Sequence, residues 1–199
     1  MIDVVGFIEL GGFYTSFMSG NTTQFGAGLV QPGLGLLLPA GLIAMFVAGS
    51  FVGSLISALG GRRGRIGTLS IVILGLLIAV ALYANGLTPS QAMLTLAAAA
   101  GAQNAVLQPG GAARLGATFV TGTLFGVGQD MARAVRGEAP PWRWVQHLLV
   151  WASLLLGAVI GAFAYGQWHV GALLVPGAIY LAFLVGNIVH VPRRSPSAS

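Results

Sequence analysis

Of the 199 residues of this chain, 56% are hydrophobic and only 7% are charged, whereas a soluble domain carries roughly 25% charged residues. Such a composition excludes a soluble protein and predicts an integral membrane protein. The formal net charge of +5 comes from arginines that flank apolar segments, which favours span anchors over nucleic-acid binding. The chain has no cysteine, which excludes disulfides and thiol chemistry.

The first half of the chain begins with two short segments and continues with two full spans. Residues 4–10 are a short apolar piece, and residues 13–30 are rich in Gly, Thr and Ser. Residues 34–59 and 66–84 are each long enough to cross a hydrocarbon core, which takes about 20 apolar residues. The basic loop at residues 60–65 separates these two spans.

The first apolar piece is far too short to span a membrane. Because a span takes about 20 residues, we expect the reading frame to continue upstream with about ten or more apolar codons. The N-terminus also lacks the basic region of a secretory signal peptide.

The second half repeats the order of segments after an uncharged turn at residues 85–90. Its segments are residues 91–107, 117–131, 144–165 and 170–189. A polar loop at residues 133–143 lies inside this half, and the basic, Ser- and Pro-rich tail at 192–199 is predicted to be disordered. The sequence therefore predicts one membrane domain, 1–199, made of two repeats, residues 1–85 and 90–191.

The main polar cluster of the chain is present once in each half. Gly20 follows Asp3 by 17 residues, and Gly122 follows Asn104 by 18. Paired, glycine-interrupted segments in the two halves of a membrane protein point to a binding site at the repeat interface. The candidate substrate-binding residues are Asp3, Ser19, Gly20, Asn21, Thr22, Thr23, Gln103, Asn104, Thr121, Gly122 and Thr123.

Both clusters have the composition of a helix start. Hydroxyl and amide side chains are preferred N-caps, and the amides that follow them are unpaired donors. Two such starts entering from opposite faces would aim two positive dipole ends at the midplane, which suits an anion or a carbonyl-bearing solute. Alternatively, these hydroxyls only hydrogen-bond to neighbouring helices. Asp3 either binds a cation or a proton within the bilayer or lies at an exposed N-terminus.

Each half also contains a GxxxG pattern, at Gly49 and Gly53 and at Gly157 and Gly161. This spacing lets helix backbones approach closely in lipid. It serves either ordinary packing inside the chain or a homo-oligomer that forms through these faces.

The distribution of the nine arginines predicts the topology. If both Gly/Thr-rich segments dip into the membrane and return, each half has three crossings and all nine arginines lie in the cytoplasm. If the second such segment crosses fully, five arginines fall outside and four inside. The sequence thus predicts an all-α, six-span bundle of two inverted three-span repeats, each with a re-entrant segment.

Other chemistry has little support in the sequence. His147, His169 and His190 are too widely separated to predict a metal site, and no motif indicates a cofactor. An intramembrane hydrolase would use Ser19, but no histidine shares its predicted depth to act as the base. We therefore do not expect an enzyme.

The motifs resemble those of a known family. The run from Asp3 to Phe7, the run from Phe17 to Thr23, Gly101–Ala105 and Thr118–Leu124 are similar to the signature of the YoaK-type bacterial membrane proteins, a family of unknown function. The resemblance covers nearly the whole chain and implies six spans in an inner membrane. Members of that family usually carry further apolar residues before the aspartate, in contrast to this chain.

These observations together predict a carrier for a small solute, such as an anion, with its site at the midplane between the repeats. The alternative is a membrane scaffold or assembly protein that does not transport. The expected partners are the lipid bilayer and the solute, with a homo-oligomer through the GxxxG faces as a further prediction.

Overall fold

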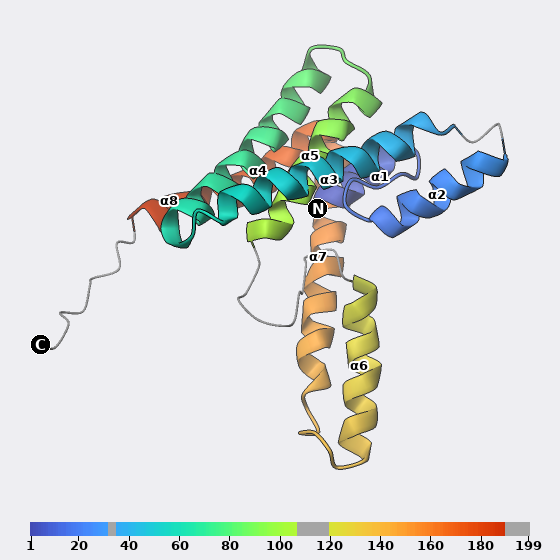
Figure 1. Cartoon of the computed structure of the whole chain (residues 1–199), viewed down its shortest axis with the longest axis vertical. Helices are drawn as coiled ribbons and strands as arrows, with labels where there is room; N and C mark the ends of the chain where they lie inside the picture. The colour runs from blue at the N-terminus through green and yellow to red at the C-terminus, as the bar shows by residue number, and fades with distance from the viewer. Residues whose placement is uncertain (32–34, 107–119, 190–199) are drawn as a thin grey trace, which may run out of the picture.

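The computed structural model describes residues 1–31, 35–106 and 120–189, and within these ranges the protein is all-helical, as predicted (Figure 1). The described residues form eight α-helices and one short 3-10 helix. These are α1 (Ile2–Glu9), α2 (Met18–Val30), α3 (Leu37–Ser57), α4 (Gly61–Ala84), α5 (Pro89–Val106), α6 (Val120–Val135), α7 (Trp144–Trp168), η1 (His169–Leu173) and α8 (Leu174–Val189).

Among the described residues, three stretches are long and apolar enough to cross a membrane. They are Leu37–Ser57, Gly61–Ala84 and the 46-residue stretch Trp144–Val189, which joins α7, η1 and α8. Large hydrophobic side chains such as Phe51, Leu74 and Phe163 are exposed along them. Exposed apolar surface of this extent is typical of helices that face lipid. The structure supplies three such stretches, where the sequence predicted six spans.

Helix α5 packs against both α3 and α4. Its alanines leave room for the backbone of α3: a Cβ added at Gly49 would collide with the carbonyl oxygen of Ala98, and one added at Gly53 would lie 2.8 Å from the Cα of Ala102. The order of these contacts makes α3 and α5 parallel. The core around them contains fully buried side chains such as Leu96.

The second GxxxG pattern packs in the same way against α1. A Cβ at Gly161 would lie 2.7 Å from Cγ1 of Val4 and 2.8 Å from Cα of Met1, whereas one at Gly157 would be 3.9 Å from the Met1 nitrogen. The order of contacts makes α1 and α7 parallel as well. Both patterns thus serve packing inside the chain, and the close approach in α7 is at Gly161 rather than Gly157.

Helices α4 and α8 pack against each other with the start of one beside the end of the other. The Arg62 Nε donates to the Asn187 carbonyl oxygen at 2.8 Å, and the Arg62 Nη2 donates to the carbonyl of Ile188. A guanidinium at a helix C-terminus satisfies carbonyls that have no partner within the helix and complements the negative end of its dipole.

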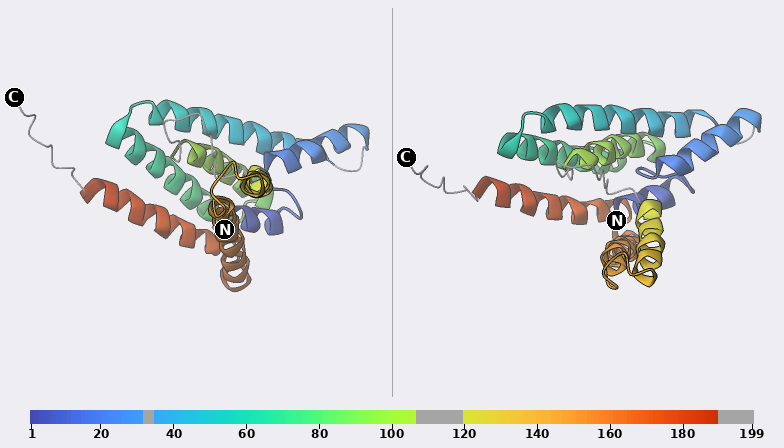
Figure 2. Two further views of the ribbon diagram at one scale, coloured as in Figure 1. Left: turned by 90° about the horizontal axis from the view of Figure 1, so that it is seen from below. Right: turned by 60° about the horizontal axis from the view of Figure 1, so that its bottom comes forward.

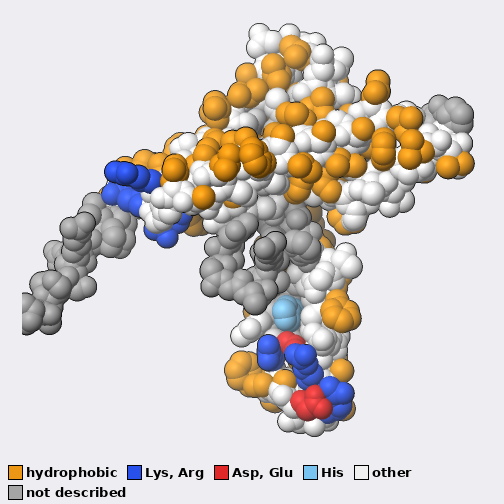
Figure 3. Space-filling model, viewed as in Figure 1, with side chains coloured by type: hydrophobic (Ala, Val, Ile, Leu, Met, Phe, Trp, Pro, Cys, Tyr) orange, Lys and Arg blue, Asp and Glu red, His pale blue; other side chains and the backbone are white. Residues whose placement is uncertain are grey.

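Helices α6 and α7 form a hairpin that projects from the rest of the molecule (Figures 1 and 2). Its ionic centre is the buried carboxylate of Asp130 in α6. The Asp130 carboxylate lies 3.3 Å from Arg143 Nε, 3.4 Å from His147 Nε2 and 3.7 Å from Arg133 Nη1. The His147 ring lies against Gly126, where a Cβ would be 3.1 Å from it. Figure 3 shows these charged side chains near the tip of the hairpin.

The glycine contact between α3 and α5 leads to a first prediction. Replacing Gly49 by alanine should destabilise the protein by about 1–3 kcal/mol, because the added methyl group forces two packed backbones apart. The unfolding temperature of the purified protein and the amount of membrane-inserted protein would both fall.

Gly186→Ala in α8 is the matched control, since no atom lies within 4 Å of that Cβ and alanine favours the helix by up to about 1 kcal/mol. Equal unfolding temperatures for the two variants would contradict the close packing of α3 on α5.

Candidate functional site

Asp3 holds the chain segment that leads back from α1 into α2. Its Oδ1 accepts the backbone amides of Thr15 at 2.9 Å and Ser16 at 2.8 Å, and the Thr15 hydroxyl at 3.2 Å. Thr15 is fully buried against Gly6, where a Cβ would collide with the threonine methyl group. Amides left unpaired at membrane depth cost several kcal/mol each, so this carboxylate stabilises an irregular segment. All three of these hydrogen bonds to Asp3 Oδ1 come from the protein's own chain.

Asn21 fixes the same segment from the other side. Its side-chain oxygen accepts the Tyr14 amide at 3.0 Å, and its side-chain nitrogen donates to the Tyr14 carbonyl at 2.6 Å. The side chain is fully buried. Gly20 lies beneath the aromatic rings of this segment, because a Cβ there would be 2.6 Å from Phe17 and 3.2 Å from Tyr14.

Helix α2 begins at Met18 with Phe17 at the N-cap position and no capping side chain. The predicted helix start is therefore correct, but the prediction that a hydroxyl or amide side chain caps it is wrong: Asn21 turns back to Tyr14 instead. The hydroxyls of Thr22 and Thr23 donate to the carbonyls of Met18 and Ser19 within the helix. Ser19, Thr22 and Thr23 are exposed on the surface of α2.

Gln103 and Asn104 lie near the end of α5 and are half-buried. The Asn104 side-chain nitrogen donates to the Ala100 carbonyl one turn back at 3.1 Å. Its side-chain oxygen is buried and has no hydrogen-bond partner among the residues that the structure describes. A buried acceptor without a partner is rare in folded proteins and calls for a physical explanation, such as an absent water or ligand.

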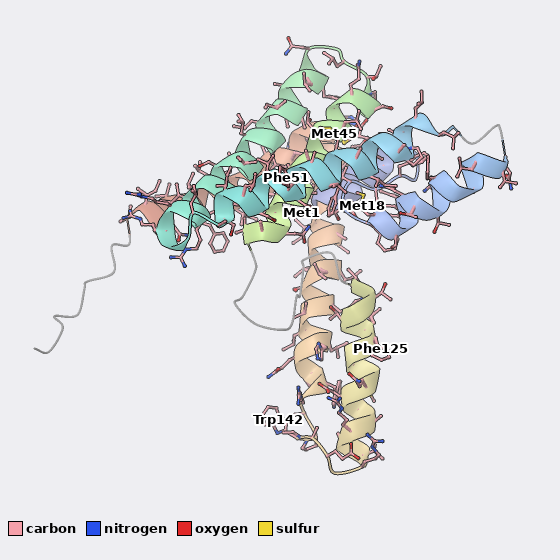
Figure 4. All side chains as sticks on the ribbon, in the orientation of Figure 1. Met1, Met18, Met45, Phe51, Phe125 and Trp142 are labelled. Atoms are coloured by element: carbon pink, nitrogen blue, oxygen red, sulfur yellow. The ribbon has the colours of Figure 1, made fainter. Side chains whose placement is uncertain are left out.

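The second cluster lies in the first turn of α6, which begins at Val120. Thr121 and Gly122 are exposed and Thr123 is buried. The first turns of α2 and α6 lie near each other in all three ribbon views, after which the helices diverge (Figures 1 and 2). Met18, which marks the start of α2, is labelled near this region in Figure 4. Two helix starts from different halves of the chain therefore point toward one region.

Sequence reasoning missed the residues that hold the segment before α2. Gln24 donates to the Gly12 carbonyl at 2.8 Å, and Tyr165 in α7 donates to Glu9 at 2.8 Å. The glycines at positions 11 and 12, both with positive φ, signal an irregular turn that needs side-chain partners. No sequence pattern, however, indicates which side chains supply them. Within the described ranges, no group of three potential metal ligands is present.

Comparison with known proteins relates this chain to a family and to a transmembrane relative. Residues 1–186 match the family of proteins of unknown function DUF1275. The chain is also similar to a UPF0700 transmembrane protein of Rhizobium meliloti (strain 1021), with 33% identity over 98% of this chain and 83% of the relative. No solved structure gives a significant match.

A transmembrane relative of nearly the same extent, together with apolar helices of spanning length, defines a helical membrane protein. The chain belongs to the DUF1275 family, in agreement with the resemblance noted in its motifs.

The two contacts of Asn21 lead to a second prediction. Asn21→Ala should destabilise the protein by about 2 kcal/mol, at about 1 kcal/mol for each lost hydrogen bond, because it frees the buried amide and carbonyl of Tyr14. Titration with a denaturing detergent, followed by circular dichroism, would measure the loss.

Thr22→Ala provides the control, since the Thr22 side chain is exposed and bonds only within its own helix. If the two variants unfold at the same detergent concentration, Asn21 does not hold the segment.

Proposed function

We propose that this protein is a six-span, multi-pass protein of a bacterial inner membrane, built from two inverted repeats that correspond to α1–α4 and α5–α8. The relative directions of two packed helix pairs support this arrangement. In the predicted topology α3 and α5 both run toward the cytoplasm while α1 and α7 both run away from it. The parallel contacts of Gly53 with Ala102, and of Gly161 with Met1, agree with this.

The contacts of Arg62 favour this topology over a full crossing by α6. If α6 crossed, α8 would end outside, on the opposite side from the basic loop at the start of α4. Arg62 lies at that start and contacts the carbonyls of Asn187 and Ile188 at the end of α8. One guanidinium cannot reach across a hydrocarbon core about 30 Å thick, so both ends belong to one face.

The topology is testable with reporter fusions, our third prediction. Fusions after Arg65, Gly137 and Arg194 should report the cytoplasm, and fusions after Gly86 and Gln167 should report the exterior. The measurement is the ratio of a reporter active only in the periplasm to one active only in the cytoplasm. A periplasmic signal at Gly137 would mean that α6 crosses, and the inverted arrangement would then be wrong.

Within this architecture we infer that the protein carries a small solute, such as an anion, between the two halves of the chain. The observation that carries the proposal is the approach of the first turns of α2 and α6, one from each repeat (Figures 1 and 2). Helix starts present unpaired amides and a positive dipole end, which favour anionic and carbonyl-bearing ligands. Discontinuous helices of this kind form the substrate sites of many secondary transporters.

The residues of the candidate site take different parts in this proposal. Asp3 and Asn21 position the start of α2 through the backbone of the preceding segment. Ser19 and Gly122 are exposed in the two first turns and are available to a solute. The unpaired side-chain oxygen of Asn104 offers an acceptor in the second half.

The fourth prediction tests transport. Ser19→Leu and Gly122→Leu should each lower uptake by about tenfold or more, the equivalent of one or two lost hydrogen bonds, because an apolar side chain covers the amides of the first turn. We prefer these variants to Gly20→Leu, because a side chain at position 20 would displace Phe17 and Tyr14 and disturb the fold. The measurement is uptake into proteoliposomes from a panel of inorganic anions, short carboxylates and neutral amides, per inserted molecule.

Ser153→Leu, at an exposed position on α7, is the matched control and should transport as the unmodified protein does. Normal transport per molecule by both first-turn variants would rule out the site. If the unmodified protein moves no solute of the panel, the carrier proposal fails and the scaffold alternative replaces it.

A further inference from the structure

An apolar groove runs between α3 and α4, with α5 as its floor. The two long helices diverge from the turn at Ala58–Gly60, and α5 packs against both (Figure 1). The groove has a volume of about 290 Å³, close to the lower limit of about 300 Å³ for small-molecule sites. Met45, labelled in Figure 4, Ala48 and Val52 line it from α3, and Ile71, Leu74 and Ile78 line it from α4.

The lining suits hydrocarbon and offers little to a polar ligand. Thr95 is its one polar side chain, and the Thr95 hydroxyl donates to the Ala92 carbonyl at 2.6 Å. Gly49 of α3, Gly75 of α4 and Ala98 of α5 add no large side chain to the lining. Leu74 and Val52 are exposed at the mouth, so the groove opens onto the lipid-facing surface.

Two exposed arginines lie on α4 beyond the end of the groove that is nearer the turn between α3 and α4. Arg63 and Arg65 lie in the first turns of α4, are exposed, and form no ion pair with any described carboxylate. Their neighbour Arg62 is occupied by the end of α8. Figure 3 shows basic side chains at this end of the molecule, with hydrophobic side chains beside them. Two unpaired arginines beside a helix N-terminus attract an anion such as a phosphate.

The distance along α4 from these arginines to the groove fits a lipid whose head group lies at the arginines. An α-helix rises 1.5 Å per residue, so Ile71 lies about 12 Å along α4 from Arg63. One leaflet of the hydrocarbon core is about 15 Å thick. An acyl chain that begins at the level of Arg63 therefore reaches the near half of the groove.

We propose that the groove between α3 and α4 binds one acyl chain of an anionic phospholipid, whose phosphate pairs with Arg63 and Arg65. This site is separate from the region between the starts of α2 and α6, and it does not depend on transport. A lipid seated there would pack on both long helices of the first half and on α5.

Native mass spectrometry of the full chain, purified in detergent, tests the head-group part of the proposal. Dioleoyl phosphatidylglycerol should bind about tenfold more tightly than dioleoyl phosphatidylcholine, because only the former has a net negative charge that complements the arginines. Arg63→Gln combined with Arg65→Gln should remove this difference, whereas Arg136→Gln, at an exposed arginine of the hairpin, should keep it. Equal binding of the two lipids to the unmodified protein would overturn the proposal.

A second pair of variants tests the groove itself. Ala48→Trp places an indole in the groove from an exposed position and should lower phosphatidylglycerol binding by about tenfold. Ala44→Trp, one turn away on α3, exposed and outside the lining, should leave binding unchanged. Equal binding by these two variants would show that the lipid lies elsewhere. A dimer that Ala48→Trp abolishes and that excludes lipid would assign the groove to a second copy of the chain and overturn the proposal.

Discussion

The structure depends on the requirement that backbone polar groups within a membrane find partners inside the protein. Long helices meet this requirement by themselves, but the segment between α1 and α2 is irregular and cannot. The side chains of Asp3, Asn21 and Gln24 supply partners for the backbone of Gly12, Tyr14, Thr15 and Ser16. These three polar side chains of an otherwise apolar chain therefore serve a place where its backbone departs from a helix.

The same constraint separates two tasks that one polar cluster could perform. Asp3 and Asn21 bond to the backbone of their own protein, so their loss is expected to unfold a local segment. Ser19 and Thr22 lie on the exposed side of the same helix, so their loss leaves that segment intact. A variant of Asn21 that fails to transport would thus say little about the solute, whereas a variant of Ser19 would test it directly.

Close packing of small residues holds the bundle together where few polar bonds are available. Gly49 and Gly53 let α3 rest on the alanines of α5, and Gly161 lets α7 rest on α1. Without a hydrophobic force between helices in lipid, such van der Waals contact is a main source of association. The divergence of α3 and α4 around the small side chains of α5 also creates the groove that we assign to a lipid.

The sequence by itself determined the solvent, the helical class and the family motifs, because composition and the length of apolar segments report these directly. It also located the start of α2 to within a few residues. It could not assign partners: that Asp3 binds Thr15, that Asn21 binds Tyr14, and that Asp130 gathers Arg143 and His147 follows from contacts between separate segments. Likewise, spacing predicted close approach at the GxxxG patterns, but only the tertiary structure decided which helix each one meets, since that choice depends on which neighbouring helix offers small side chains or a free face.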